Sequence, residues 1–169
     1  MQVVLPPGGK DAKAYVTTTQ DVEIIRYFPL QGALPEGQIL VLNTELATLS
    51  LLSRGEAEGA LPRLLIQQQF TASELSLLTP LLEQFPHYCP YEVMFASFYN
   101  GVITEHTIER CRIQLQEAQD AGVWDQQMRP VRNVLSRIRF KLRGFGLDIV
   151  SILETGYILM LTGRTKFRS

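Results

Sequence analysis

The stretch VLSRIRFKLRGFG, residues Val134 to Gly146, carries four cations and no acid, although the formal net charge of the 169-residue chain is only −1. Charge is distributed unevenly along the chain. Residues 129–169 hold nine Arg and Lys side chains against two acids, a balance of +7, whereas residues 1–128 have a balance of −8. A basic block at one end of an acidic molecule is typical of a surface that binds a polyanion, and the acidic remainder orients that surface toward nucleic acid.

Helical periodicity explains how these cations are arranged. We expect a helix over 130–143, because Pro130 is tolerated in a first turn, where the amide hydrogen that it lacks has no partner. At 100° per residue, the apolar side chains of this helix fall within an arc of about 80°. They are Val131, Val134, Leu135, Ile138 and Leu142. The opposite side carries Arg132, Asn133, Ser136, Arg137, Phe140 and Arg143. One face is therefore predicted to be core and the other to be a cationic surface.

The segments on both sides of this helix predict its neighbours. LDIVSILETGYILML, at 147–161, predicts two strands around a turn at 154–156. Upstream, TASE at 71–74 is a capping box that opens a helix with leucines at helical spacing. Two more helices are expected, over 91–99 and over 104–121, and each is followed by a glycine.

Short segments rich in Val, Ile and Leu dominate the N-terminal third and predict an antiparallel sheet. They lie at 22–28, 38–43, 46–52 and 63–69. The pattern at 46–52 also suits a helix. We divide the chain into a flexible arm (1–20), the sheet (21–69), a helical domain that ends in the hairpin (70–162) and a basic tail (163–169).

Composition favours a protein of the cytoplasm. No apolar run is long enough to span a membrane, and the N-terminal residues lack the pattern of a signal peptide, so no membrane partner is expected. The two cysteines, Cys89 and Cys111, are too few for a disulfide scaffold and lack the spacing of a zinc site. We expect both to be buried thiols.

Three separated segments resemble one family. They are FTASELSLLTPLLEQFPHYCPYEVMFASFYNG (70–101), RPVRNVLSRIRFKL (129–142) and TGY (155–157). In this order they resemble the first two helices, the recognition helix and the wing of the OmpR/PhoB-type winged helix-turn-helix DNA-binding effector domains. The likeness covers about residues 63–160. It implies an α+β fold with an N-terminal antiparallel sheet, a three-helix core, one inserted helix at 104–121 and a C-terminal hairpin wing.

The resemblance implies a sequence-specific transcriptional regulator that binds double-stranded DNA, with the helix at 130–143 in the major groove and the wing toward the minor groove. Contacts to bases then fall to Arg132, Asn133, Ser136 and Arg137, whose side-chain types suit base edges. Contacts to phosphates fall to Arg129, Arg139, Lys141, Arg143, Thr155, Arg164 and Lys166. Phe140 either contacts a thymine methyl or folds back onto the wing, and we favour the packing.

The chain departs from the family in three places. The residues before the helices are too few for a receiver domain, so control by phosphorylation is not expected. Leu153 and Glu154 stand where the family has Arg-Gly, which puts an acid near the phosphates. The helix at 104–121 is inserted before the recognition helix, in a connection that is short in the family and touches RNA polymerase. It either pads the core through Ile108, Cys111 and Leu115, or forms a platform for RNA polymerase or for a second copy of the protein on DNA.

Catalysis is not expected. His87 and His106 have no carboxylate or thiol at a spacing that builds a metal site or a triad, and no phosphate-binding glycine motif is present. We therefore expect no cofactor and no metal. The alternative to DNA binding is a winged-helix module that binds protein, as an adaptor or assembly factor without specific DNA binding.

Overall fold

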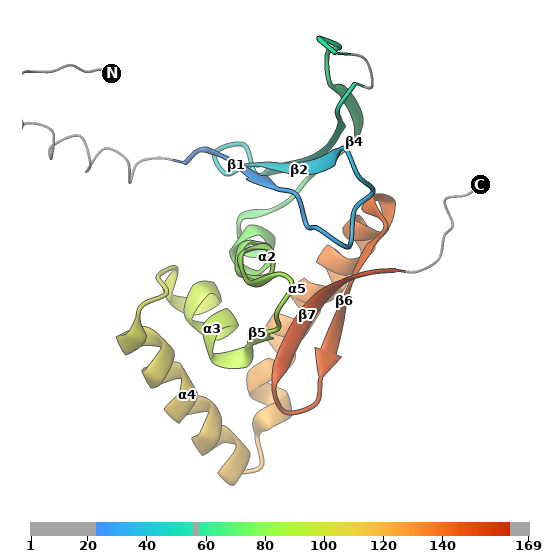
Figure 1. Ribbon diagram of the computed structural model, residues 1–169. Helices are drawn as coiled ribbons and strands as arrows, with labels where there is room; N and C mark the ends of the chain where they lie inside the picture. The colour runs from blue at the N-terminus through green and yellow to red at the C-terminus, as the bar shows by residue number, and fades with distance from the viewer. Residues whose placement is uncertain (1–22, 56–57, 163–169) are drawn as a thin grey trace, which may run out of the picture.

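The computed structural model describes residues 23–55 and 58–162. The arm predicted over 1–20 and the basic tail over 163–169, with Arg164 and Lys166, lie outside the described residues. The described chain is an α+β fold in which an antiparallel sheet precedes four helices and a C-terminal hairpin (Figure 1). None of its helices combines the length and apolar character needed to cross a bilayer.

The N-terminal sheet is an antiparallel meander in the order β1-β2-β3-β4. Its strands are β1 (Ile25–Phe28), β2 (Gln38–Asn43), β3 (Thr48–Ser53) and β4 (Arg63–Gln69). All four predicted strands are confirmed, including the segment at 46–52 whose pattern also suited a helix. This segment begins its strand only at Thr48, because the Asn43 side-chain oxygen accepts hydrogen bonds from the amides of Glu45 and Leu46 and closes a turn there.

The helix α2 (Ala72–Gln84) begins at the predicted capping box. The Thr71 hydroxyl accepts a hydrogen bond from the Glu74 amide at 3.2 Å, and the Glu74 carboxylate accepts one from the Thr71 amide at 2.9 Å. Two backbone donors that a helix start leaves without partners are thus satisfied. The Glu74 side chain is thereby held at the N-terminal end of α2.

The second predicted helix consists of α3 (Tyr91–Phe95) and a π-helical turn over Ala96–Asn100. This turn also supplies a hydrogen bond that α2 lacks. Pro80 lies inside α2 and has no amide hydrogen to donate to the Ser76 carbonyl. The hydroxyl of Ser97, in the π-helical turn, donates to that carbonyl at 2.6 Å. The two helices are therefore joined at the point where α2 lacks its own hydrogen bond.

The inserted helix is α4 (Glu105–Asp120), with the predicted cap at Thr104. Its side chains Cys111, Leu115 and Ala118 are buried. In Figure 1, α4 lies beside α3, away from the hairpin. The expectation that this helix packs on the core is confirmed for the buried side of α4.

The helix α5 spans Trp124–Leu142, so the prediction that it starts near Pro130 is wrong. Packing explains the longer helix. The Trp124 ring meets the Tyr91 ring edge-on at a centroid distance of 5.3 Å, and Met128 is 2% exposed. Burial of these side chains offsets the cost of a proline inside the helix. Pro130 itself lies on the exposed side of α5.

The predicted hairpin is confirmed as β6 (Leu147–Ile152) and β7 (Gly156–Leu161), with the turn between them. The short strand β5 (Cys89–Pro90) pairs with β7 and completes a sheet in the order β5-β7-β6. Gly156 is required by this pairing, because a Cβ at that position would overlap the Cys89 carbonyl oxygen. The glycine of the TGY segment thus ties the hairpin to the start of α3.

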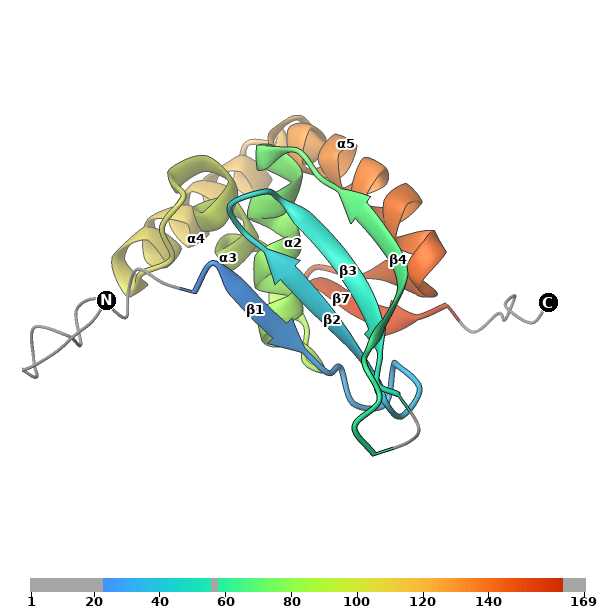
Figure 2. The ribbon, with the colours of Figure 1, turned by 90° about the horizontal axis from the view of Figure 1, so that it is seen from above.

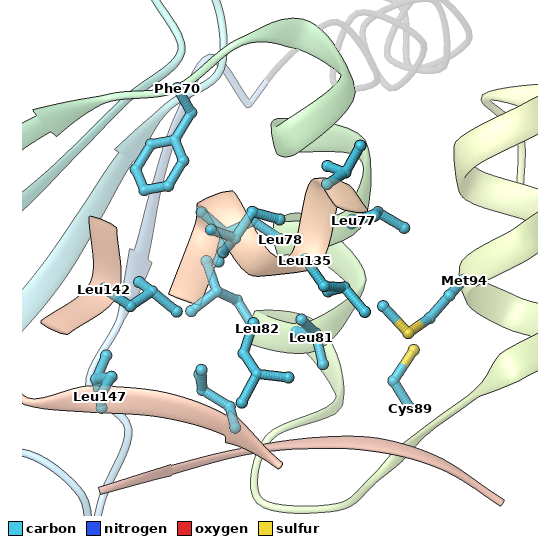
Figure 3. Close-up of a cluster of buried hydrophobic side chains, with 14 of the residues drawn as sticks. Phe70, Leu77, Leu78, Leu81, Leu82, Cys89, Met94, Leu135, Leu142 and Leu147 are labelled. Carbon is cyan, nitrogen blue, oxygen red and sulfur yellow. The ribbon is translucent and has the colours of Figure 1, made fainter. Parts of the chain in front are cut away.

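One hydrophobic core joins the two sheets and the helices. Figure 2 shows the four N-terminal strands crossing over α2, with α5 alongside β4. Beneath them, Phe70, which follows β4, meets side chains from α2, β5, α3, α5 and β6 in the cluster drawn in Figure 3. All five predicted core residues of α5 are buried: Val131, Val134, Leu135, Ile138 and Leu142.

A substitution at Ile138 tests which face of α5 is buried in the core. Its side chain is fully buried, so Ile138→Ala should lower the free energy of unfolding by about 2–5 kcal/mol through lost burial and the cavity left behind. The matched control is Ile113→Ala on α4, where the isoleucine is 49% exposed and the same substitution should cost far less. Urea unfolding of both variants measures the difference. Equal stabilities would show that the buried face of α5 is assigned wrongly.

Candidate functional site

The surface of α5 opposite the core carries one continuous row of side chains, which we call the outward stripe. Its members follow each other at helical spacings of three or four residues, and all are exposed. They are Arg129, Asn133, Ser136, Phe140 and Arg143. Arg143 lies just beyond α5, in the 3₁₀ turn Arg143–Phe145. The stripe combines guanidinium, amide and hydroxyl groups with one aromatic ring. Four other predicted DNA contacts of α5 lie beside the stripe: Arg132, Arg137, Arg139 and Lys141.

Arg132 and Arg139 lie on the side of α5 that faces the hairpin. Arg139 forms a two-pronged ion pair with Asp148 of β6, with distances of 2.8 Å from Nε to Oδ1 and 3.2 Å from Nη2 to Oδ2. This hydrogen bonding raises the pKa of the Arg139 guanidinium. Burial tends to raise the pKa of Asp148, but the hydrogen bonds from Arg139 and from the Ile149 amide hold it below its usual value. Arg132 forms an ion pair with Asp125, which lies about two helical turns earlier in α5. The distance from Arg132 Nη2 to Asp125 Oδ1 is 2.8 Å.

Arg137 and Lys141 lie on the other side of α5 and converge on Glu74. The Arg137 Nε lies 3.2 Å from one carboxylate oxygen, and the Lys141 Nζ lies 2.6 Å from the other. Lys141 also donates to the Gln69 carbonyl at 2.9 Å and sits over the Phe70 ring. Glu74 is 1% exposed and is the single buried charged side chain among the described residues. It therefore links the end of β4, the start of α2 and the middle of α5.

The ionised form of Glu74 is favoured in the folded protein. Burial alone raises the pKa of the carboxyl, but hydrogen bonds from Lys141, the Thr71 amide and Arg137, together with the Lys141 charge, lower it below its usual value. A buried carboxylate is costly unless it is paired and hydrogen-bonded, and Glu74 has both forms of compensation.

Intramolecular pairing neutralises much of the predicted cationic surface. Of the six predicted cations at 129–143, Arg132, Arg137, Arg139 and Lys141 share three carboxylates. Within residues 23–55 and 58–162, Arg129 and Arg143 form no ion pair. The two cations without an ion pair are thus those of the outward stripe, and the Arg143 charge acts on Asp148 only at longer range.

Two other predicted features differ in the structure. Phe140 is 68% exposed, so the expectation that it packs back onto the hairpin is wrong, because the hairpin lies on the Arg132 and Arg139 side of α5. Thr155 is half-buried, and its hydroxyl donates to the Leu153 carbonyl within the turn at 3.0 Å. Leu153 is 85% exposed, and Glu154 follows it with a φ of 57°. The tip of the hairpin therefore presents a leucine and an acid.

Sequence reasoning missed the three acids that hold these cations. Glu74 was recognised only as a capping residue. Asp125 and Arg132 are seven residues apart and share one face of α5, but a helix that starts at Pro130 does not include Asp125. Asp148 belongs to a strand, and its pairing with Arg139 depends on where the hairpin packs.

Burial raises the pKa of both cysteine thiols and disfavours the thiolate form. Cys89 and Cys111 are free and buried, as predicted. Burial, with the negative charges of Glu83 and Glu92, raises the pKa of Cys89 to about 12. The part of the chain that the structure describes contains no group of three or more His, Cys, Asp or Glu side chains placed to hold a metal ion.

Comparison with known protein families, with curated proteins and with solved structures finds no match to this chain.

The pairing around Glu74 predicts a pH-dependent loss of stability. Glu74→Gln removes two charge-assisted hydrogen bonds and should lower the free energy of unfolding at pH 7 by about 1–3 kcal/mol. Because the folded pKa of Glu74 lies below that of the unfolded chain, its contribution is complete above the unfolded pKa and is lost as the pH falls through the folded pKa. The difference between wild type and variant should therefore shrink on acidification. Glu117→Gln, at an exposed position on α4, is the control. A difference that stays constant from pH 7 to pH 3 would contradict this role.

Proposed function

We propose that this protein is a sequence-specific regulator of transcription that binds double-stranded DNA through α5, in the manner of a winged helix-turn-helix protein. The observation that carries the proposal is the outward stripe. Its polar groups project from a helix whose opposite face is packed into the core, and its two cations form no ion pair within the described residues. A rigid helix that presents Arg, Asn and Ser along one line has the width and the hydrogen-bonding groups that the major groove accepts.

The outward stripe divides into two kinds of contact. Asn133 and Ser136, near its middle, carry the amide and hydroxyl groups that read base edges, and their side chains form no hydrogen bond within the described residues. Arg129 and Arg143 stand nearer its ends, where phosphate contacts orient a helix in the groove. Phe140 presents an apolar surface that suits a thymine methyl.

Arg132 and Arg137 remain candidates for base contacts, because their side chains are 43% and 54% exposed. Each must share its guanidinium with the carboxylate that it already contacts. An arginine has five donors, so a second acceptor can be bonded without full release of the first. We expect these residues to contribute less affinity than an unpaired arginine at the same place.

The hairpin would serve as the wing. Its tip, with Leu153 and Glu154, lacks a cation for the minor groove, so its contribution to affinity should be small. The same exposed leucine, together with Phe140, favours the second candidate function, a module that binds another protein. The two functions differ in their salt dependence, because only DNA binding releases phosphate counterions.

Selection of bound sequences from random duplexes, followed by gel shifts over a salt series, tests the proposal. We expect affinity for the selected site to fall steeply as salt rises. Asn133→Ala should weaken this site by about 1–3 kcal/mol and relax base preference, whereas Arg143→Ala should weaken all duplexes similarly and reduce the salt slope by about 1.

Arg54→Ala is the control for charge, because Arg54 is exposed outside α5 and the hairpin. It should change neither quantity appreciably. If no duplex is enriched, or if binding does not respond to salt, the protein-binding function replaces the DNA-binding one.

The inserted helix α4 is proposed to contact RNA polymerase or a second copy of the protein. Its face opposite the buried side chains carries Glu109, Ile113, Glu117 and Asp120, all of them exposed. Acidic side chains are repelled by phosphates, whereas an acidic rim around an isoleucine that is 49% exposed suits a protein surface. Padding of the core and contact with a partner are compatible, because they use opposite faces of α4.

This role predicts a separation of binding from output. The double variant Ile113→Ala/Glu117→Ala should keep its affinity for the selected DNA site within a factor of about three, because no residue of α5 changes. It should lose its effect on transcription from that site, or its self-association in sedimentation. Gln119→Ala, exposed on another side of the same helix, should retain both. Unchanged transcription and self-association in the double variant would contradict a contact through this face.

A further inference from the structure

A cleft of about 310 Å³ lies between α5 and the hairpin. Figure 1 shows the hairpin running along α5, with its turn near the end of α5 that follows α4. The cleft combines an aromatic wall (Tyr91, Trp124 and Tyr157), two guanidinium groups (Arg132 and Arg139) and two hydroxyls (Ser136 and Ser151). A cavity of this size with convergent polar groups is typical of a small-molecule site.

The aromatic wall is built from three segments that are distant in the sequence. The Tyr91 ring meets Trp124 at 5.3 Å and Tyr157 at 5.4 Å, in both cases edge-on, with interplanar angles of 68° and 74°. All three rings are half-buried. The Tyr91 hydroxyl donates to the Ile152 carbonyl at 3.4 Å, which ties this wall to the hairpin. The wall is therefore held in place before any ligand arrives.

The polar wall keeps hydrogen-bond donors available. Arg132 uses one Nη atom for Asp125, and Arg139 uses Nε and one Nη atom for Asp148. Because a guanidinium has five donors, both arginines retain donors for a further acceptor. The two-pronged pair with Asp148 also fixes the guanidinium plane of Arg139, which lowers the entropy lost when a ligand is bound.

Tyr157 adds a neutral donor, whereas the Tyr91 hydroxyl already donates to the Ile152 carbonyl. Burial raises the pKa of Tyr91 and, against the effect of the nearby Arg132 charge, the pKa of Tyr157. Both hydroxyls are therefore protonated at neutral pH. The cleft thus offers hydrogen-bond donors and cations next to flat apolar rings.

We propose that this cleft binds a small aromatic anion, with its ring against Trp124, Tyr91 and Tyr157 and its carboxylate or phosphate group between Arg132 and Arg139. The cleft selects for both parts of such a ligand. Stacking and edge contacts with the three rings favour a planar apolar body. Charge-assisted hydrogen bonds from two arginines favour an acidic group and match the geometry of a carboxylate or a phosphate.

A bound ligand would also control the surface of α5. Arg132 and Ser136 line the cleft and are also predicted to contact bases. A ligand bound in the cleft would occupy both side chains, so they could not contact DNA at the same time. This second step rests on the proposed DNA-binding function, whereas the binding site itself does not. Ligand and DNA should then weaken each other's binding by the same factor, as linkage requires.

Trp124 is the only tryptophan of the chain and reports on the cleft directly. Its fluorescence is followed while benzoate, phenyl phosphate or 4-hydroxyphenylacetate is added to the full chain. We expect a saturable change for at least one of these probes. Benzamide, which lacks the charge, and inorganic phosphate, which lacks the ring, should bind at least tenfold more weakly.

Variants on both walls locate the binding. Arg132→Gln and Arg139→Gln should each weaken the best probe tenfold or more, and Asp125→Asn should strengthen it, because Arg132 is then released. Ser151→Phe, which fills the cleft and leaves both ion pairs intact, should abolish binding. Arg54→Gln is the matched control and should have no effect. Urea unfolding shows whether each variant is folded. If Arg139→Gln does not fold, the result for Ser151→Phe still decides whether the probe binds in the cleft.

The outcomes for the cleft and for DNA binding can be separated. If none of the three aromatic anions saturates, or if the Ser151→Phe variant still binds, the ligand site is overturned and the gel-shift experiments on α5 are unaffected. If a probe saturates and the selected duplex is bound with unchanged affinity at a saturating probe concentration, the competition is overturned and the ligand site stands. Reciprocal weakening of probe and duplex supports both steps.

Discussion

The arrangement of this protein depends on one buried carboxylate. Glu74 caps α2 through the Thr71 amide and holds Arg137 and Lys141 of α5 at 3.2 Å and 2.6 Å, while Lys141 reaches on to the Gln69 carbonyl at the end of β4. Because Glu74 is 1% exposed, loss of either cation would leave its carboxylate buried with less compensation. The sheet, α2 and α5 are thereby fixed in one orientation, and the outward stripe of α5 takes its direction from it.

The same pairing limits the charge that α5 presents. Four of its cations serve the fold by contacting Glu74, Asp125 or Asp148. A phosphate backbone near α5 would therefore face carboxylates as well as cations. Of the cations described at 129–143, only Arg129 and Arg143 present a positive charge without a paired carboxylate. Such a surface favours discrimination over raw affinity, because weak electrostatic attraction gives less binding to DNA of arbitrary sequence. The same pairing places Asp125 and Asp148 beside the two arginines that line the cleft at the hairpin.

Local physical rules made much of the fold predictable. The capping box at Thr71 and Glu74, the Thr104 cap and the apolar arc on α5 each depend on residues within a few positions of one another, and all are confirmed. The strands were recognised from their β-branched and leucine-rich pattern and from the turns between them. The exposed row of Asn133 and Ser136 followed from helical geometry alone, because spacing of three or four residues places them on one side.

Distant contacts decided the rest. The sequence by itself determined the order of the elements, the buried face of each helix and the concentration of cations at 129–143. Tertiary structure decided that α5 begins at Trp124, because a tryptophan packed on Tyr91 and a buried Met128 outweigh the local preference of Pro130 for a first turn. It also decided which cations are free and where a cleft forms, since Glu74, Asp148 and Tyr157 approach α5 only when α2 and the hairpin pack against it. Ion pairs and cavities form between segments that folding brings together. The spacing of residues along the sequence does not show which distant segments will pack against each other.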